Sequence, residues 1–456
     1  MYKIKGDFFM NILVLNGSPK GDYSITLHTC LYLQKLHPEH NFEILHVGQK
    51  IKAIERDFSQ SKELIEKADV LLFSYPVYTF IATCQLHRFI ELMKENNVCV
   101  KGKIATQITT SKHFYDVTAH RYIQENCDDM GINYIRGLSA DMEDLTTEKG
   151  QKEAKSFFDH FIWCAENGYF EKPVAKKYDF TPVSATPLSS TDEKKGNVVV
   201  VTDLGTDDTE LGNMIDRFRA KLCAKTRLIN IREYPFKGGC LGCFRCAADG
   251  VCVYKDGFDS FLRNEIQSAD AIIYAFTIKD HSMGSVFKMY DDRQFCNGHR
   301  TVTIGMPVGY LINGKYEDEI NLQTILEGRA QVGGNILTGI ATNEADTDYE
   351  IDKLAASVEY ALENKNTQPQ NFYGVGGMKI FRDLIYQMRG LMKADHKFFK
   401  SHGQYDFPQK KKGMTMLMYL VGGLNASEKV RAKMGNKMNE GMVMPYKQLL
   451  DKMDKQ

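Results

Sequence analysis

The sequence lacks any excess of charge, because its 58 basic and 58 acidic residues cancel. This balance favours neither DNA, RNA nor an anionic membrane as the main partner, so we expect no nucleic-acid partner. A bilayer-spanning run is also missing, since the longest apolar run near the C-terminus, Met414 to Leu424, is short and contains two glycines. The first ten residues lack the apolar core of a signal peptide. These absences predict a cytoplasmic protein without a transmembrane segment.

Two chemical signals are absent as well. There is no Rossmann glycine fingerprint, so the sequence does not distinguish NADH from NADPH. No side chain stands out as a general acid or base, and the catalytic residues stay unknown at this point. Eleven cysteines are present, and in a cytoplasmic protein they are more often metal ligands, redox groups or core residues than disulfides.

Strands and helices alternate along most of the 456 residues. In the first half, apolar runs predict strands at 11–15, 42–47, 69–74, 104–109 and 132–137. The pattern starts again after residue 196, with strands predicted at 197–202, 227–232, 271–275, 301–305 and 335–340. Such alternation is typical of a parallel sheet covered on both faces, and five strands fit the order 2-1-3-4-5. We therefore expect an internal duplication: two tandem flavodoxin-like, doubly wound parallel five-stranded sheets in an α/β fold.

The remaining segments set the expected domain limits. Residues 173–196 are rich in proline, serine and threonine and are interpreted as a linker between domains 10–172 and 197–365. Residues 366–456 form a helical C-terminal extension, with a loop at 374–377 and an amphipathic helix at 378–392. Its Lys410–Lys412 run precedes a methionine-rich stretch, for which docking on the protein itself or a second subunit is favoured over docking on a membrane.

The turn after the first strand has the features of a phosphate site. Asn16, Gly17 and Pro19 break the strand, and Ser24 or Thr26 can cap the helix that follows. Backbone N–H groups and the helix dipole then favour an anion, with hydroxyl groups and the charge of Lys20 beside them. An ordinary strand-to-helix turn is the alternative interpretation of this stretch alone.

Two further loops belong to the same end of the sheet. Ser74-Tyr-Pro-Val-Tyr78 follows the third strand and can place Val77 and Tyr78 against a planar ring, which favours a flavin over a merely packed turn. Thr109-Thr-Ser-Lys-His113 ends the fourth strand and can bond the ring's polar edge. The residues predicted to bind the flavin and its phosphate are Ser18, Lys20, Ser24, Ile25, Thr26, Pro76, Val77, Tyr78, Thr79, Thr110 and Ser111.

The second half contains a compact cysteine motif of spacing C-x2-C-x2-C-x5-C. Its members, Cys240, Cys243, Cys246 and Cys252, are predicted to bind one metal centre. Four thiolates suit a [4Fe–4S] cluster or Zn²⁺, and the compact spacing favours the cluster over a zinc ribbon. Free or redox-active thiols are the alternative. The other seven cysteines are scattered and are interpreted as core residues.

These motifs resemble a known family. The Gly17–Lys20 turn, the Pro76–Tyr78 loop, the segment 239–243 and the runs 252–256 and 288–293 are similar to the NADPH-dependent FMN reductase superfamily. Within it, the cysteine motif resembles the iron–sulfur flavoproteins. The resemblance covers about residues 10 to 365. It implies FMN bound non-covalently, electrons from a nicotinamide or an iron–sulfur partner, and a dimer.

The chain departs from that family pattern because the phosphate turn and the cysteines lie in different halves. In the second half, Asp203, Asp207, Asp208 and Glu210 replace the serines and lysine of the first turn. We therefore predict one FMN per chain, in the first domain. A duplicated chain can also pair its two sheets as a pseudo-dimer, although pairing with a second chain as a homodimer stays open.

The function that follows is an FMN-dependent NAD(P)H oxidoreductase, similar to the FMN reductases, with an Fe–S centre as a further redox group. A nicotinamide or a redox protein donates electrons, and a small molecule or a protein accepts them. The rival hypothesis is a non-catalytic electron carrier or redox-regulated protein, with a structural zinc ion at the cysteine motif.

Overall fold

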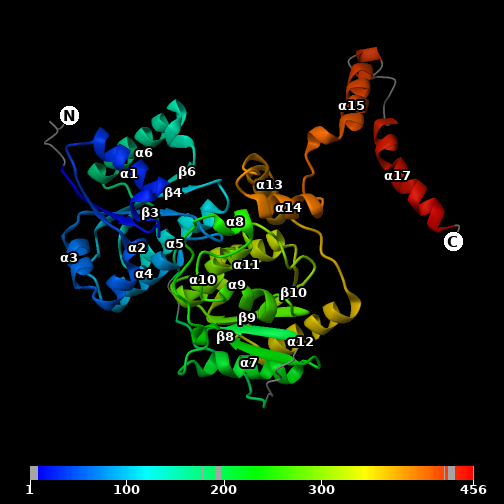
Figure 1. Cartoon of the computed structure of the whole chain (residues 1–456), viewed down its shortest axis with the longest axis horizontal. Coiled ribbons are helices and arrows are strands. Elements are labelled where there is room, and N and C mark those ends of the chain that lie inside the picture. Colours follow the sequence, from blue (N-terminus) through cyan, green and yellow to red (C-terminus); the bar gives the residue numbers. More distant parts are fainter. Residues whose placement is uncertain (1–8, 177–178, 190–196, 426, 430–436, 455–456) are drawn as a thin grey trace. The chain divides into compact units, whose positions relative to one another are not determined.

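The structure is a computed structural model that describes residues 9–176, 179–189, 197–425, 427–429 and 437–454. Within these residues, strands and helices alternate to build two parallel sheets (Figure 1), which confirms the predicted α/β fold class. By its contacts the chain divides into two units, Met1–Phe398 and Phe399–Gln456. Both sheets belong to the first unit.

The first sheet comprises the first half of the chain. Its elements are β1 (Asn11–Asn16), α1 (Ile25–Leu36), β2 (Asn41–Leu45), α2 (Val47–Arg56), α3 (Ser59–Lys67), β3 (Val70–Pro76), α4 (Cys84–Glu95), β4 (Ile104–Ser111), α5 (Asp116–Asp129), β5 (Asn133–Tyr134), β6 (Leu138–Asp141) and α6 (Glu148–Asn167). The strand order is β2-β1-β3-β4-β5, and β6 also pairs with β4. All of these ladders are parallel.

One predicted strand of this sheet is divided. The expected strand 132–137 consists of the short strands β5 and β6, both paired with β4. Gly137 lies between them, so close to β4 that a Cβ atom there would be 2.4 Å from the carbonyl oxygen of Gln107. The backbone leaves the ladder at this point, and the first sheet therefore has six strands rather than five.

The second sheet repeats the order of the first. Its elements are β7 (Val198–Thr202), α7 (Thr209–Lys221), β8 (Thr226–Asn230), α8 (Arg245–Asp249), α9 (Phe258–Phe261), β9 (Ala271–Thr277), α10 (Gly284–Arg293), β10 (Pro307–Asn313), α11 (Ile320–Gly333), β11 (Ile336–Thr342) and α12 (Thr347–Asn364). The strand order β11-β10-β9-β7-β8 is the predicted 2-1-3-4-5 order in reverse direction.

The predicted fourth strand of this sheet is wrong. Residues 301–305 form a turn, and the strand is β10, which begins two residues later. Val302 and Ile304 are 43% and 53% exposed, so their alternation does not mark a buried strand. The continuous apolar run in β10 provides what a sheet covered on both faces requires, namely side chains that can be buried on either side.

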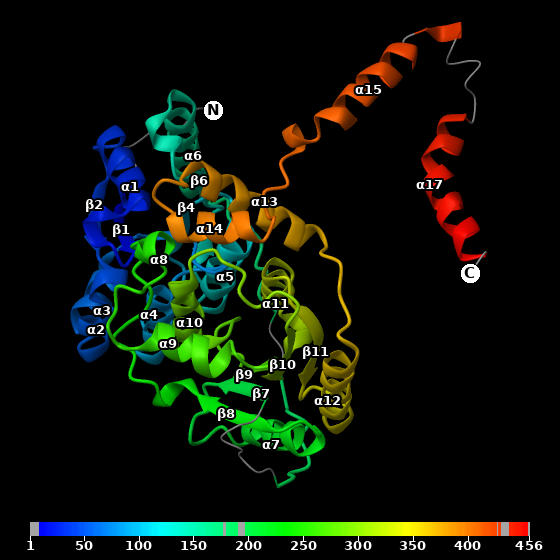
Figure 2. The ribbon, with the colours of Figure 1, turned by 45° about the vertical axis from the view of Figure 1, so that its right-hand side comes forward.

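Helices cover both faces of each sheet, and the largest core lies between the sheets. α1 and α6 pack on the outer face of the first sheet, and α7 and α12 pack on one face of the second (Figure 2). The inner faces share one continuous core, to which Phe89 and Tyr122 contribute from the first half and Phe287 and Tyr290 from the second. Burial of this apolar surface is the main force that joins the two halves.

Reciprocal polar contacts orient the two halves at this junction. The Glu91 carboxylate on α4 accepts hydrogen bonds from the Ser285 backbone N–H and hydroxyl at the start of α10, each 2.7 Å long. In return, Asp292 at the end of α10 accepts from the Cys84 backbone N–H at the start of α4, at 2.8 Å. Each helix thus caps the other, as in an isologous dimer. The expected pseudo-dimer packing within one chain is confirmed by these contacts.

The C-terminal extension is helical, as predicted, with one correction. Its helices are α13 (Phe372–Gln387), α14 (Lys393–Ser401), α15 (Lys412–Asn425) and α17 (Lys437–Met453). The predicted loop 374–377 is wrong, because α13 already includes it. Gly374 and Gly377 are buried against α11, where a Cβ atom would lie 2.7 Å from the Gln331 oxygen and 2.6 Å from Val332. These glycines are packing residues rather than helix breakers.

The second unit contains α15 and α17, whose apolar side chains are mostly exposed. Among the helices that the structure describes, none combines the length and the apolar character that crossing a bilayer requires.

Candidate functional site

The phosphate turn has the geometry that its sequence indicates. The Ser24 hydroxyl accepts from the Leu27 backbone N–H at 3.3 Å and so caps α1. The N–H groups of Ile25 and Thr26, the first two of the helix, have no partner within it. Asn16 shapes the turn, since its amide accepts from the Ser18 N–H at 3.2 Å and donates to the Gly21 oxygen at 3.1 Å. The turn therefore presents free N–H donors and buried hydroxyls to an anion.

The loop after β3 forms a second wall. The Tyr78 N–H donates to the Ile81 oxygen at 2.9 Å, and Thr79 and Phe80 adopt positive φ angles of 41° and 75°. Lys288 from α10 is fully buried and donates to the Tyr78 carbonyl at 3.1 Å. The second half of the chain thus holds the loop in its tight conformation.

The tyrosine of this loop has a buried and unsatisfied hydroxyl group. Among the described residues, the Tyr78 hydroxyl has no hydrogen-bond partner. Its burial raises the pKa of the phenol well above the usual value. A buried hydroxyl without a partner is costly, so a ligand that offers an acceptor here would stabilise the loop.

The end of β4 completes the pocket. The Thr110 hydroxyl lies 2.6 Å from that of Thr26, which ties β4 to the start of α1. The Ser111 hydroxyl accepts from the His113 N–H at 2.9 Å. Both residues are more than nine-tenths buried.

These walls enclose one cavity that also meets the cysteine motif. All eleven residues predicted to bind FMN line it, together with Cys240, Cys243, Cys246 and Cys252. Lys20 connects the two groups, because its Nζ lies 5.5 Å from the centre of the Phe244 ring in the cysteine loop. Burial lowers the pKa of Lys20. The structure thus brings both sets of predicted site residues together from opposite halves of the chain.

Two glycines allow the cysteine loop to lie close to the loop after β3 and the start of α4. A Cβ atom at Gly242, whose φ is 59°, would lie 1.8 Å from the Tyr78 hydroxyl. A Cβ atom at Gly239 would lie 2.2 Å from the sulfur atom of Cys84. No other residue type fits these two positions without moving the loop.

A buried ion pair fixes the outer side of the same loop. Arg293, at the end of α10, donates to both carboxylate oxygens of Asp256 at 2.8 and 2.9 Å and to the Gly238 oxygen at 2.9 Å. The Tyr254 ring lies 4.5 Å from its guanidinium carbon, and one of its nitrogen atoms lies 4.0 Å from the Cys252 sulfur. The ion pair thus fixes the loop that carries Cys252 and places a positive charge beside its sulfur atom.

The cysteine side chains in this structure are arranged as separate thiols. Cys246 donates to the Phe295 oxygen at 2.8 Å, and burial raises the pKa of its thiol to about 11. Burial also raises the pKa of the Cys240 thiol. Among the described residues, no three cysteine sulfur atoms lie within 4.8 Å of one another. With Zn–S bonds of about 2.3 Å, four thiolates on one zinc ion lie only about 3.8 Å apart, so the loop is not preformed for zinc.

The sequence did not indicate several other residues at the cavity. Ile380, Phe381 and Leu384 of α13 line it, and Phe381 stacks on Phe114 with ring centres 4.6 Å apart. Cys296 lines it too, although it is assigned to the core from the sequence alone. No local spacing links these residues to the motifs, because they come from distant parts of the chain.

A buried carboxylate ties the C-terminal extension to this cavity wall. Asp395 in α14 is fully buried and accepts from the His299 N–H and ring nitrogen, each at 3.0 Å. It also pairs with Arg300 at 2.7 Å, and Arg300 donates to the Cys246 oxygen at 3.1 Å. The part of the extension that precedes Phe399 therefore helps to build the cavity wall.

The equivalent turn of the second sheet is occupied by its own side chains. Asp208 caps α7 by accepting from the Leu211 N–H at 3.2 Å, and it also accepts from Asn313 at 3.0 Å and from Thr277. A carboxylate thus lies at the helix N-terminus where the first sheet has free N–H donors. A negative charge at this position disfavours a phosphate, in line with the prediction that the first domain binds the FMN.

Comparisons with known proteins concern the first half of the chain. Residues 10–123 match the family model described as NADPH-dependent FMN reductase, which confirms the resemblance for this stretch. No curated protein matches the chain.

Several solved structures are similar to about a third of the chain. The flavoenzyme NAD(P)H:(acceptor) oxidoreductase FerB from Paracoccus denitrificans is 23% identical, with a TM-score of 0.30, over 35% of this chain and 98% of its own. General stress protein 14 from Treponema denticola, in complex with FMN, is 14% identical over 34% and 98%, with a TM-score of 0.26. An FMN-dependent NADH-azoreductase from Bacillus anthracis, in complex with FMN, is 12% identical over 33% and 98%, with a TM-score of 0.27.

Proposed function

We propose that the chain is an FMN-dependent oxidoreductase that takes electrons from NADH or NADPH and passes them to an acceptor. The observation that carries this proposal is the common cavity, which all eleven predicted flavin residues line from the ends of three neighbouring strands, β1, β3 and β4, and the loops that follow them. The family match over residues 10–123 supports the same cofactor.

Each wall has a distinct part in binding. The N–H groups at the start of α1, with Ser18 and Ser24, bind the phosphate. Tyr78 packs against the ring and donates its otherwise unpaired hydroxyl proton, and Thr110 and Ser111 bond the polar edge. When bound, FMN supplies hydride acceptance and one- or two-electron reduction, while the protein supplies orientation and exclusion of water.

We also propose that Cys240, Cys243, Cys246 and Cys252 hold a [4Fe–4S] cluster beside the flavin. All four line the flavin cavity, and Lys20 and Arg293 place positive charge next to them. Such a site would pass single electrons between the flavin and a partner.

The test is anaerobic purification followed by a visible spectrum and by flavin, iron and sulfide analysis. We expect one FMN per chain and oxidation of NADH or NADPH when an acceptor is present. A chain that takes up no FMN from solution would refute the oxidoreductase proposal. A chain with FMN but without iron and sulfide after reconstitution would refute only the cluster.

A further inference from the structure

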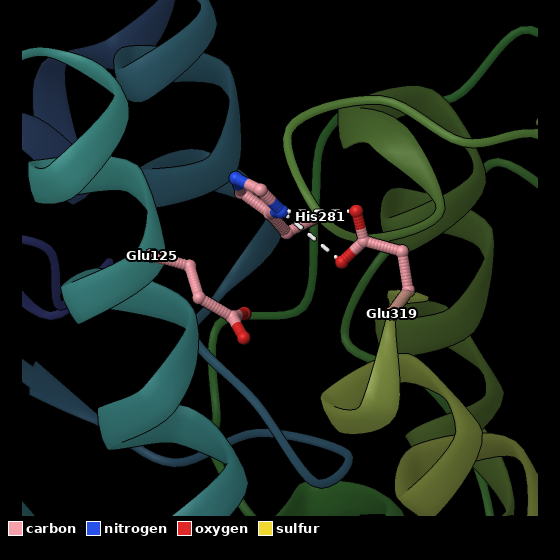
Figure 3. A group of neighbouring side chains, drawn as sticks. All are labelled: Glu125, His281 and Glu319. Atoms are coloured by element: carbon pink, nitrogen blue, oxygen red, sulfur yellow. Dashed lines mark hydrogen bonds and ion pairs between the residues drawn. The ribbon is translucent and has the colours of Figure 1, made fainter. Parts of the chain in front are cut away.

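Three ionisable side chains converge where the two sheets meet, outside the cavity described above. Glu125 comes from α5, His281 from the loop after β9, and Glu319 from the residue before α11. One ligand atom of each lies within 4.8 Å of the others, and the two glutamates are each only 4% exposed. Figure 3 shows the three side chains directed into the same space.

The imidazole is oriented as in known metal sites. Its Nε2 lies 3.0 Å from a carboxylate oxygen of Asp129, and Lys94 pairs with the same carboxylate at 2.9 Å. A carboxylate on the outer nitrogen holds the ring in place, an arrangement that accompanies most metal-binding histidines. The other nitrogen, Nδ1, faces Glu319 and lies 3.0 Å from both of its oxygens, so a bound ion would take the place of the proton between Nδ1 and this carboxylate.

Glu125 is the independent sign of a missing ligand. Its Oε1 accepts from Arg121 at 2.9 Å, but its Oε2 is buried and has no partner among the described residues. A buried carboxylate oxygen without a partner costs several kcal/mol in the folded state. A cation bound to Oε2 would remove this cost.

Charge and distance both fit a divalent ion. Two basic side chains, Lys94 and Arg121, pair with carboxylates of this group. The carboxylates number four and belong to Glu125, Asp129, Asp280 and Glu319. A proton on His281 supplies one further positive charge, whereas a divalent ion supplies two. Bonds of 2.0–2.2 Å to one ion place neighbouring ligand atoms about 3.0–3.5 Å apart, so the present hydrogen-bond distance of 3.0 Å between Nδ1 and Glu319 can be kept and the Glu125 oxygen, within 4.8 Å, needs only a small shift.

We propose that Glu125, His281 and Glu319 bind one divalent transition-metal ion, with Asp129 as the residue that positions His281. Two carboxylates and one imidazole suit Mn²⁺, Fe²⁺ or Zn²⁺. The ion links α5 of the first sheet to two segments of the second, so it acts as a structural clamp between the sheets and is independent of the flavin.

The test uses Mn²⁺, because thiolates prefer softer ions and the cysteine motif therefore does not compete. The full-length protein is titrated with Mn²⁺, free Mn²⁺ is measured by electron paramagnetic resonance, and the unfolding temperature is recorded in parallel. We expect one ion per chain and a higher unfolding temperature with Mn²⁺. Failure of the wild-type protein to bind Mn²⁺ at about 1 mM would overturn the proposal.

Matched variants locate the ion. Glu125→Gln should weaken binding by more than about tenfold and abolish the rise in unfolding temperature, while Asp129→Asn should weaken it by about 10–100-fold. Glu153→Gln, on the exposed surface of α6, should bind as the wild type does. Unchanged Mn²⁺ affinity in Glu125→Gln would refute the site. If that variant does not fold, Glu319→Gln provides the same comparison.

Discussion

The strongest test of the flavin site is to give the first turn the charge that the second turn already has. Ser24 and Asp208 occupy the same position, because each caps the first helix after the first strand of its sheet. Aspartate caps helices as well as serine does, so Ser24→Asp should keep the bond to the Leu27 N–H and leave α1 stable. It adds one negative charge at a buried position that lines the cavity.

The expected loss of affinity follows from this added charge. A carboxylate about 4 Å from one phosphate charge costs about 4 kcal/mol at the effective dielectric of a protein surface. This free energy corresponds to a roughly thousandfold increase in the Kd for FMN. The affinity is measured by the quenching of flavin fluorescence on titration with the flavin-free protein.

Two controls separate charge from shape. Ser24→Asn keeps a capping side chain of similar size without charge, and we expect its Kd to stay within about tenfold of the wild-type value. Asp208→Ser removes one carboxylate from the second turn. The other acidic residues of that turn remain, so the stoichiometry should stay at one FMN per chain. The reasoning fails if Ser24→Asp binds FMN as tightly as Ser24→Asn does, or if the wild type binds two.

Three other variants test the remaining parts of the architecture. Cys243→Ser should lose iron and sulfide but retain FMN, whereas Cys99→Ser, an exposed control, should retain both; elemental analysis and the flavin spectrum decide this. Phe381→Ala should open the wall formed by α13. With free FMN and ferricyanide as the two electron acceptors, the ratio of their kcat/KM values should rise about tenfold or more in favour of FMN. An unchanged ratio would exclude a role of Phe381 in selecting acceptors. Burial raises the pKa of Asp203 to about 7, so its ionisation destabilises the folded state as pH rises from about 4 to 7. Asp203→Asn should therefore be more stable than the wild type at pH 8, by about 2–4 kcal/mol in urea unfolding, and equal to it near pH 3.5.

That the eleven candidate flavin residues would line one cavity could be predicted because they are local in sequence. Ser18 to Thr26, Pro76 to Thr79 and Thr110 to Ser111 each directly follow a buried strand, and parallel strands bring such turns to one edge of the sheet. The cysteines were grouped by their close spacing in sequence, and the structure places all four at the same cavity. The strand error at 301–305 arose because a short exposed turn can mimic alternation, and only burial distinguishes it from β10.

The contacts between distant segments could not be predicted from spacing. Phe381 reaches the cavity because Gly374 and Gly377 let α13 pack closely on α11, and a pair of glycines in a sequence more often indicates a loop. Likewise, more than 150 residues separate Glu125 from His281, so only the packing of the two sheets reveals that they meet.

The two halves of the chain carry different site residues, and their covalent linkage makes this difference possible. In a symmetric dimer of identical chains, a change in one phosphate turn or one cysteine loop appears in both copies. Here the reciprocal caps of Glu91 on Ser285 and of Asp292 on Cys84 preserve the paired arrangement, although the residues in the two positions differ. The turn at Asp208 can therefore contain a carboxylate while the turn at Ser24 remains without one. Because α4 and α10 hold the sheets together, the candidate flavin residues of the first sheet and the cysteine loop of the second line a single cavity.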